Sequence, residues 1–165
     1  MGEDTTRRED LTLGRDVFMS HVEGVLDPAY RLASVILLDY AAAEDAVHDA
    51  TLRAWSRYRR MGGEVTSFRT WFLSIVVVRC RAARRLRLLA RRSGESGIAP
   101  AGGLGDALVG LPLASRAALF CFVSLDLPMD EVARVLGTSL ARVRSRVYRA
   151  GERVRAQLER EALEA

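Results

Sequence analysis

The chain contains no lysine, and all 25 of its basic residues are arginine. It has only two cysteines and two histidines, and none of them stands at the spacing of a zinc site or a C-x-x-C motif. The apolar stretches around Cys80 and Cys121 predict buried, reduced thiols. No apolar run approaches the roughly 20 residues that span a bilayer, and residues 1–16 lack a signal-peptide core. We therefore expect a cytoplasmic protein without metal, cofactor or membrane insertion.

Charge alternates strongly along the chain. Residues 1–56 carry a net charge of −6, residues 57–92 of +10, residues 93–133 of −4 and residues 134–155 of +6. Two separate basic blocks indicate two contacts with nucleic acid on a protein that also has other partners. The planar fork of arginine suits phosphate and guanine recognition, although a total lack of lysine also fits a GC-rich genome.

The segment of residues 130–155 has the pattern of two helices joined by a tight turn. Gly137 stands where a left-handed residue can end the first helix, and Ser139 can cap the second. The second helix has one apolar stripe, formed by Val143, Val147, Ala150, Val154 and Leu158. Arginines dominate its opposite face. The pattern predicts a helix-turn-helix that presents a cationic helix to DNA; the alternative is an ordinary solvated helix surface.

The remaining periodicity predicts an all-α protein. Helices are expected over residues 15–26, 28–40, 42–58, 67–90 and 113–124. The β-branched run of residues 74–78 would suit a strand, but the apolar residues on either side of it keep helical spacing. Small, nearly uncharged residues predict a flexible linker over residues 93–105. The expected organisation is a four-helix domain over residues 1–92 and a three-helix domain over residues 106–165.

Three segments resemble a known family. Residues 44–55 (EDAVHDATLRAW) resemble the core-binding helix of bacterial RNA polymerase sigma factors, in the small extracytoplasmic-function group of the sigma-70 superfamily. Residues 67–75 (SFRTWFLSI) are similar to the promoter-melting helix of that family, and residues 142–150 (RVRSRVYRA) to its recognition helix. The resemblance implies a promoter-specificity subunit, with a sigma region 2 domain before the linker and a sigma region 4 domain after it.

The resemblance also implies specific protein partners. An exposed ridge of the third helix, Asp45, His48 and Asp49, takes the place of the family's contact with the clamp helices of the largest polymerase subunit. His48 replaces the usual glutamine. The flap region of the second-largest subunit and an anti-sigma factor are further expected partners. Without the resemblance, the two aspartates would be interpreted as part of an ordinary solvent-exposed helix face.

The two basic blocks correspond, by the same resemblance, to two promoter contacts. The −10 element would meet Arg59, Arg60, Arg79, Arg81, Arg84, Arg85 and Arg87. The −35 element would meet Arg142, Arg144, Ser145, Arg146, Tyr148 and Arg149. Arg149 is the expected base reader, because arginine can bind the O6 and N7 atoms of guanine with two hydrogen bonds. In the family, the loop that corresponds to residues 59–66 traps a flipped base, which promoter melting requires.

Val78 departs from the family pattern, which usually has asparagine there. Valine cannot hydrogen-bond to DNA, so a second hypothesis is a sigma-like protein that does not initiate transcription. It would act as an anti-sigma-binding mimic or as a DNA-binding regulator. An enzyme is not expected, because the sequence has no phosphate-binding glycine loop, no nucleophile with a base and no metal cluster.

Overall fold

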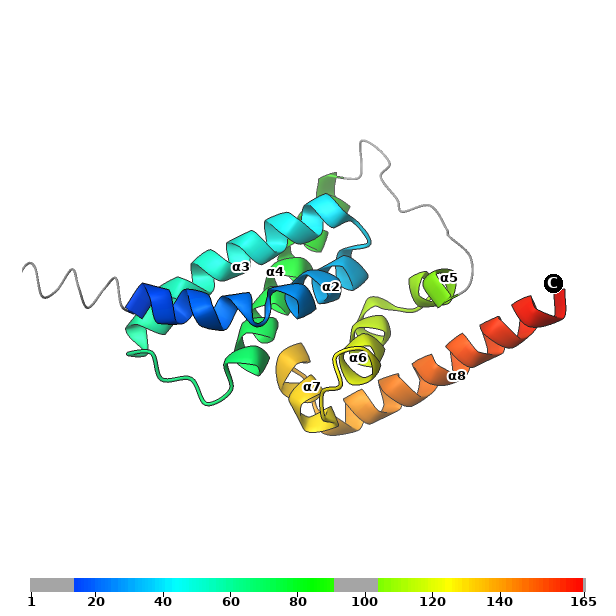
Figure 1. Cartoon of the computed structure of the whole chain (residues 1–165). Coiled ribbons are helices and arrows are strands. Elements are labelled where there is room, and N and C mark those ends of the chain that lie inside the picture. Colours follow the sequence, from blue (N-terminus) through cyan, green and yellow to red (C-terminus); the bar gives the residue numbers. More distant parts are fainter. Residues whose placement is uncertain (1–13, 91–103, 165) are drawn as a thin grey trace, which may run out of the picture.

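Helices account for every regular element in the part of the chain that the computed structural model describes, residues 14–90 and 104–164 (Figure 1). A helix over residues 14–23 is followed by three longer helices and then by four more. The labelled helices are α2 (Leu26–Leu37), α3 (Tyr40–Arg60), α4 (Phe68–Ala90), α5 (Leu104–Val109), α6 (Leu113–Val123), α7 (Met129–Leu136) and α8 (Leu140–Glu164). The predicted all-α class is confirmed. Most of the expected linker, residues 93–103, lies outside the described residues.

The junction of α2 and α3 is fixed by two neighbouring residues. Leu38 takes a left-handed conformation with φ 55° and ends α2, three residues earlier than expected from the periodicity. Asp39 then caps α3, because its carboxylate accepts a hydrogen bond of 2.9 Å from the amide of Ala42. The turn sets α2 and α3 side by side.

The β-branched run within residues 74–78 lies in the middle of α4, as the helical spacing predicted. Phe72, Leu73, Val76 and Val77 are fully buried in the core, whereas Val78 points outward and is 56% exposed. Packing of this apolar face outweighs the small cost that β-branched residues impose on a helix.

The second half of the chain contains the predicted helix-turn-helix. Gly137 ends α7 with φ 60°, and the Ser139 hydroxyl accepts a hydrogen bond from the amide of Arg142 at the start of α8. Two features differ from expectation. The short helix α5 was not predicted, and α8 continues nine residues past Arg155 to Glu164. Its apolar stripe is buried at Val143 but 38% exposed at Leu158, where the helix extends away from the body (Figure 1).

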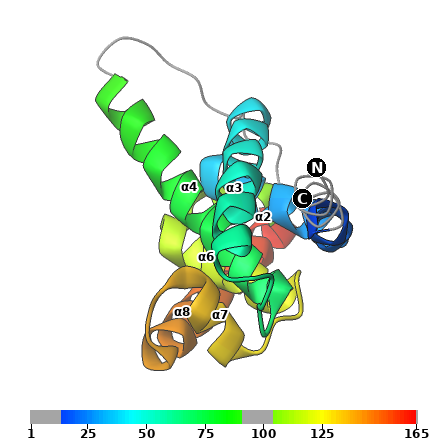
Figure 2. The same cartoon turned by 90° about the vertical axis from the view of Figure 1, so that its left-hand side faces the viewer.

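The two halves share one continuous core, with α6 packed on α2 and α7 packed on α4 (Figure 2). Arg116 of α6 lies inside it and is only 5% exposed. Its guanidinium donates to the carbonyls of Leu108, Val109 and Leu111 and, across the halves, to that of Ile36 at 3.3 Å. Desolvation, with a smaller effect of the nearby Arg84, lowers the pKa of Arg116.

Both cysteines are completely buried, Cys80 in α4 and Cys121 in α6. Loss of solvation raises the pKa of each thiol to about 12. The expectation that both thiols are buried is confirmed.

Candidate nucleic-acid interface

The predicted docking ridge divides into a free part and a paired part. Asp45 and His48 are exposed on α3. Asp49 is partly covered and forms ion pairs with Arg53, at 3.3 Å on the same helix, and with Arg79 of α4. The ridge is therefore present on one face of α3, but Asp49 also ties α3 to α4.

The arginines of α4 that were expected to contact DNA have different environments. Arg79 is held by Asp49, and Arg87 pairs with Asp39 at 2.7 Å. Arg81 is exposed, yet it donates a hydrogen bond of 2.9 Å to the carbonyl of Leu136 in the other half of the molecule. Both Arg84 and Arg85 are exposed to solvent. The structure thus leaves this pair more accessible to a phosphate than the other three.

Asp39 connects the start of α3 to the end of α4. Its carboxylate accepts from the Ala42 amide and pairs with Arg87, and these two contacts, in that order, hold its pKa below the ordinary value of 3.8. A lowered pKa means that the folded state favours the ionised carboxylate.

Replacement of Asp39 by alanine is expected to lower the free energy of unfolding by about 0.5–2 kcal/mol at neutral pH, the usual worth of an N-cap. In the wild-type protein, the contribution of the ionised Asp39 carboxylate to the free energy of unfolding is present above pH 3.8. It is lost as the pH falls through the lower pKa that Asp39 has in the folded state. Urea unfolding of both proteins at pH 7 and near pH 3 checks this. Asp39→Asn, which keeps a capping oxygen, serves as the control. A penalty for Asp39→Ala that grows on acidification would contradict the assignment.

The loop between α3 and α4 lies over a cluster of aromatic rings. Gly62 and Gly63 have positive φ angles of 65° and 81°, and a side chain at Gly63 would crowd the ring of Tyr58. Tyr58, Phe68 and Phe18 pack with centroid distances of 5.2–6.2 Å. The cluster of aromatic rings beneath the loop and the two glycines within it determine the backbone path of this loop, which was expected to receive a flipped base.

Arginines at the end of α3 and on α8 frame the rest of the candidate interface. Arg59 lies 5.8 Å from the ring of Trp55, and Arg60 is exposed beside it. On α8 the predicted contact residues lie opposite the buried stripe. All of them are exposed except Arg146, which is half-buried; they are Arg142, Arg144, Ser145, Arg146, Tyr148 and Arg149. The exposed fraction of Tyr148 is 71%.

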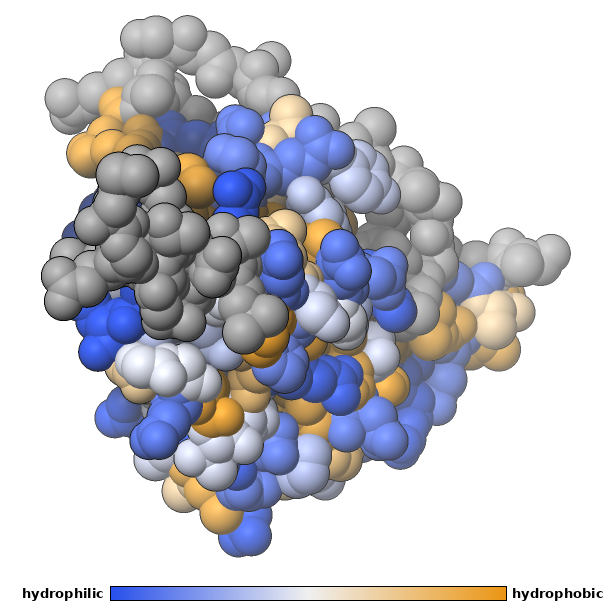
Figure 3. Space-filling view, turned by 60° about the vertical axis from the view of Figure 1, so that its left-hand side comes forward, coloured by the Kyte–Doolittle hydropathy of each residue, from blue (hydrophilic) through white to orange (hydrophobic). Residues whose placement is uncertain are grey.

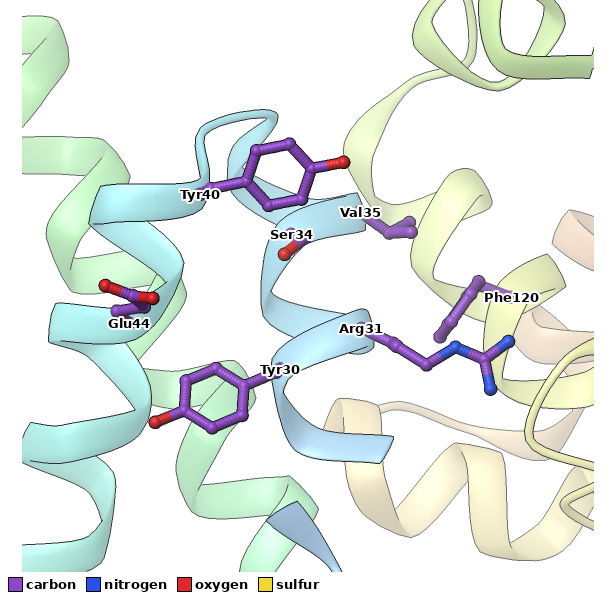
Figure 4. Close-up of a pocket in the computed structure, with 7 residues that line it drawn as sticks. All are labelled: Tyr30, Arg31, Ser34, Val35, Tyr40, Glu44 and Phe120. Carbon is purple, nitrogen blue, oxygen red and sulfur yellow. The ribbon is translucent and has the colours of Figure 1, made fainter. Parts of the chain in front are cut away.

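A separate cavity of about 410 Å³ lies over α2, between the start of α3 and α6 (Figure 4). Tyr30 and Glu44 lie on one side of it, and Arg31 and Phe120 on the other. The guanidinium of Arg31 is 5.6 Å from the ring centroid of Phe120, so this contact also joins the two halves. None of the predicted DNA-contacting or docking residues lines this cavity.

Sequence reasoning missed three residues that the structure brings to the junction of α4 with α7. Arg69, Thr70 and Glu131 make polar contacts there, whereas the sequence suggested only charge for Arg69 and Glu131. No sequence signal identified them, because their partners are 56 and 61 residues away.

The face of the molecule seen in Figure 3 is mainly hydrophilic, with hydrophobic residues in smaller patches.

No helix within residues 14–90 and 104–164 combines the length and the apolar character needed to cross a membrane. The same residues contain no cluster of three or more histidine, cysteine, aspartate or glutamate side chains that could hold a metal ion.

Comparison with known proteins finds a family similarity within the first half of the chain. Residues 21–92 match the family model described as sigma-70 region 2. The fold is similar to that of the sigma factor RpoE from Bartonella quintana, solved in complex with the anti-sigma factor NepR. The TM-score is 0.69 at 21% sequence identity, and the match covers 86% of this chain and 96% of that one. No curated protein matched the sequence.

Proposed function

We propose that this chain is an RNA polymerase sigma factor of the extracytoplasmic-function group of the sigma-70 family, and that it uses one surface for core polymerase and two for promoter DNA. Sigma factors are promoter-specificity subunits, and the family does not itself catalyse the reaction. Polymerisation belongs to the core enzyme, which places the proposed activity in the cytoplasm. The domain division at residues 93–105 is part of the proposal.

Polymerase docking is assigned to the exposed ridge of α3. Asp45 and His48 are accessible there, and Asp49 lies one turn from Asp45 on the same face. The carboxylates of this ridge complement a positively charged surface on a partner protein and increase the rate at which the two proteins associate. Clamp helices of the largest subunit are the proposed partner. The flap of the second-largest subunit is the proposed partner of the second half of the chain.

The −10 contact is assigned to the basic face of α4 and the adjoining loop. Arg84 and Arg85 are the accessible phosphate contacts, and Arg59 and Arg60 stand at the loop itself. Arginine–phosphate contacts of this kind weaken steeply as salt rises. Val78, more than half exposed on α4, offers the DNA strand an apolar surface instead of a hydrogen bond.

The −35 contact is assigned to α8, and this assignment carries the promoter-recognition part of the proposal. The decisive observation is its geometry: Arg144 and Arg149 project from an exposed face while Val143 anchors the opposite face in the core. A recognition helix needs this division between a fixed and a free face. Arg149 is proposed to read guanine and Arg146 to contact phosphate.

The test is transcription in vitro by core polymerase with the purified protein on a library of genomic promoter fragments. We expect start sites that core polymerase alone does not use, and their loss with Arg144→Ala and Arg149→Ala combined. Permanganate footprinting at those sites then reads promoter melting. No new start site across the library would overturn the proposal. Promoter binding without unpaired thymines would support the alternative of a DNA-binding regulator.

An anti-sigma factor is the proposed regulatory partner. The support is the similar fold of RpoE, which was solved in complex with its anti-sigma factor NepR.

A further inference from the structure

One side of α4 carries apolar side chains that are exposed to solvent. Val78, Leu86 and Leu89 are 56%, 67% and 69% exposed, and Ala82 between them is half-buried. At 3.6 residues per turn, the four positions fall within about 80° of the helix circumference. We call these four residues the apolar seam. Its width matches the contact line between two paired helices better than the broader apolar face of a helix in a globular core.

The seam runs toward the end of α4, which projects from the body of the molecule (Figure 2). Contiguous exposed apolar residues mark an interaction surface. DNA does not account for this one, because a phosphate gains nothing from an aliphatic side chain. A membrane surface favours a wider apolar face than the seam offers. The seam therefore fits another helix.

Opposite charges line the two sides of the seam. On the side toward α3, Asp49 pairs with Arg79, and Asp45 lies one turn away on the same ridge. By the helical spacing, Arg81 and Arg85 lie on the other side of the seam from Arg79. Residues 79–90 contain no acidic residue. From α3 across α4, the surface thus consists of an acidic, an apolar and a basic strip.

The acidic strip lies level with the middle of the seam. Asp39 at the start of α3 pairs with Arg87 near the end of α4. Asp49, further along α3, pairs with Arg79, which is nearer the start of α4. The two helices are therefore antiparallel. Asp45, which stands between the two paired aspartates in the sequence, is level with the middle of the seam.

We propose that the apolar seam packs against the same seam of a second copy of this chain, with the two α4 helices parallel across a two-fold axis. A two-fold dimer requires a self-complementary surface. With the axis along α4, the basic strip of each copy faces the acidic strip of the other, so that Arg85 lies opposite Asp45 of the second copy. An antiparallel pair would bring acid against acid. The small Ala82 side chains allow the two helices to approach.

The dimer covers surfaces that have other proposed partners. It buries the docking ridge around Asp45 and restricts access to Arg85, so the dimer and the polymerase complex exclude each other. This consequence rests on the proposed function, but the dimer itself does not. If added core polymerase binds the dimer without dissociating it, the docking assignment of α3 fails and the dimer stands.

Cross-linking tests the parallel arrangement on the whole chain. The two Leu89 side chains meet at the axis, so Leu89→Cys should form an intermolecular disulfide under mild oxidation with copper phenanthroline. The matched control is Leu88→Cys, which is 56% exposed on the same helix but about 100° away around it. The natural thiols are buried, with pKa values of about 12. We expect at least about tenfold more cross-linked dimer for Leu89→Cys, and equal yields would overturn the proposal.

Sedimentation velocity over a range of micromolar concentrations measures the dimer without any cross-link. A seam of about three turns predicts a weak dimer, with a Kd in the micromolar range. Leu86→Asp removes one leucine from each side and should raise the Kd at least about 100-fold. Leu88→Asp, outside the seam, should leave it within about fivefold. A wild-type chain that stays monomeric overturns the dimer, including one that instead binds phosphatidylglycerol vesicles through Leu86.

A charge exchange tests the partner strips. Asp45→Arg and Arg85→Asp should each raise the Kd by about tenfold or more, because each pair occurs twice in the dimer. The two changes combined restore opposite charges and should return the Kd to within about fivefold of the wild type. Additive losses in the combined variant would overturn the proposed pairing of the two strips.

Discussion

Charge reversal of Asp45 to lysine is expected to weaken binding to core RNA polymerase at least about 30-fold. Loss of a close charge pair at an interface costs about 2–5 kcal/mol, and reversal adds repulsion. Asp45 is exposed on α3, so its replacement leaves the packing of the chain intact. Titration of labelled protein with purified core polymerase measures the affinity, and circular dichroism confirms that the variant is folded.

The control for this change is Glu44→Lys. Glu44 is the neighbouring acid on the same exposed helix, but it faces the cavity over α2 (Figure 4). Equal losses for the two variants would show a general charge effect and would contradict a docking ridge. Asp49 is a poorer target, because Asp49→Lys would place a cation against both Arg53 and Arg79 and disturb the α3–α4 pair.

Replacement of Arg116 by methionine is expected to lower the free energy of unfolding by about 3 kcal/mol. Methionine fills much of the same volume, but it leaves the carbonyls of Ile36, Val109 and Leu111 without their donor inside the core. Relief from burying a cation beside Arg84 offsets part of this loss. Urea unfolding monitored by tryptophan fluorescence measures the change.

Arg134→Met provides the comparison for Arg116. Arg134 is exposed, and within the described residues its ion-pair partner is Asp130 on the same helix, so its loss should cost less than about 1 kcal/mol. An equal or greater stability of Arg116→Met relative to the wild type would show that desolvation of the guanidinium outweighs its four hydrogen bonds.

Helices and turns were predictable because their determinants are local. Gly137 and Ser139 reveal the turn before α8, since a left-handed ending and a capping hydroxyl act within four residues. The predicted ends of helices were wrong where the residues that set them are not part of the apolar periodicity. The left-handed Leu38 shortened α2, and α8 runs on to Glu164, six residues past Leu158, the last member of its predicted apolar stripe.

Contacts between the halves could not be predicted from the sequence. Arg81 and Arg116 look like ordinary members of charged or apolar helices, and the acceptors they find are backbone carbonyls, which every residue carries. The residue types in the sequence therefore do not reveal which carbonyl an arginine side chain will bind. The docking ridge and the DNA-facing arginines were named from motif resemblance, and their functional roles remain predictions.

The complete burial of the two cysteines determines how they react with oxidants. Burial raises the thiol pKa values to about 12, so the thiolate, which is the form that peroxides attack, is strongly disfavoured at neutral pH. Cys80 and Cys121 are therefore poor oxidant sensors.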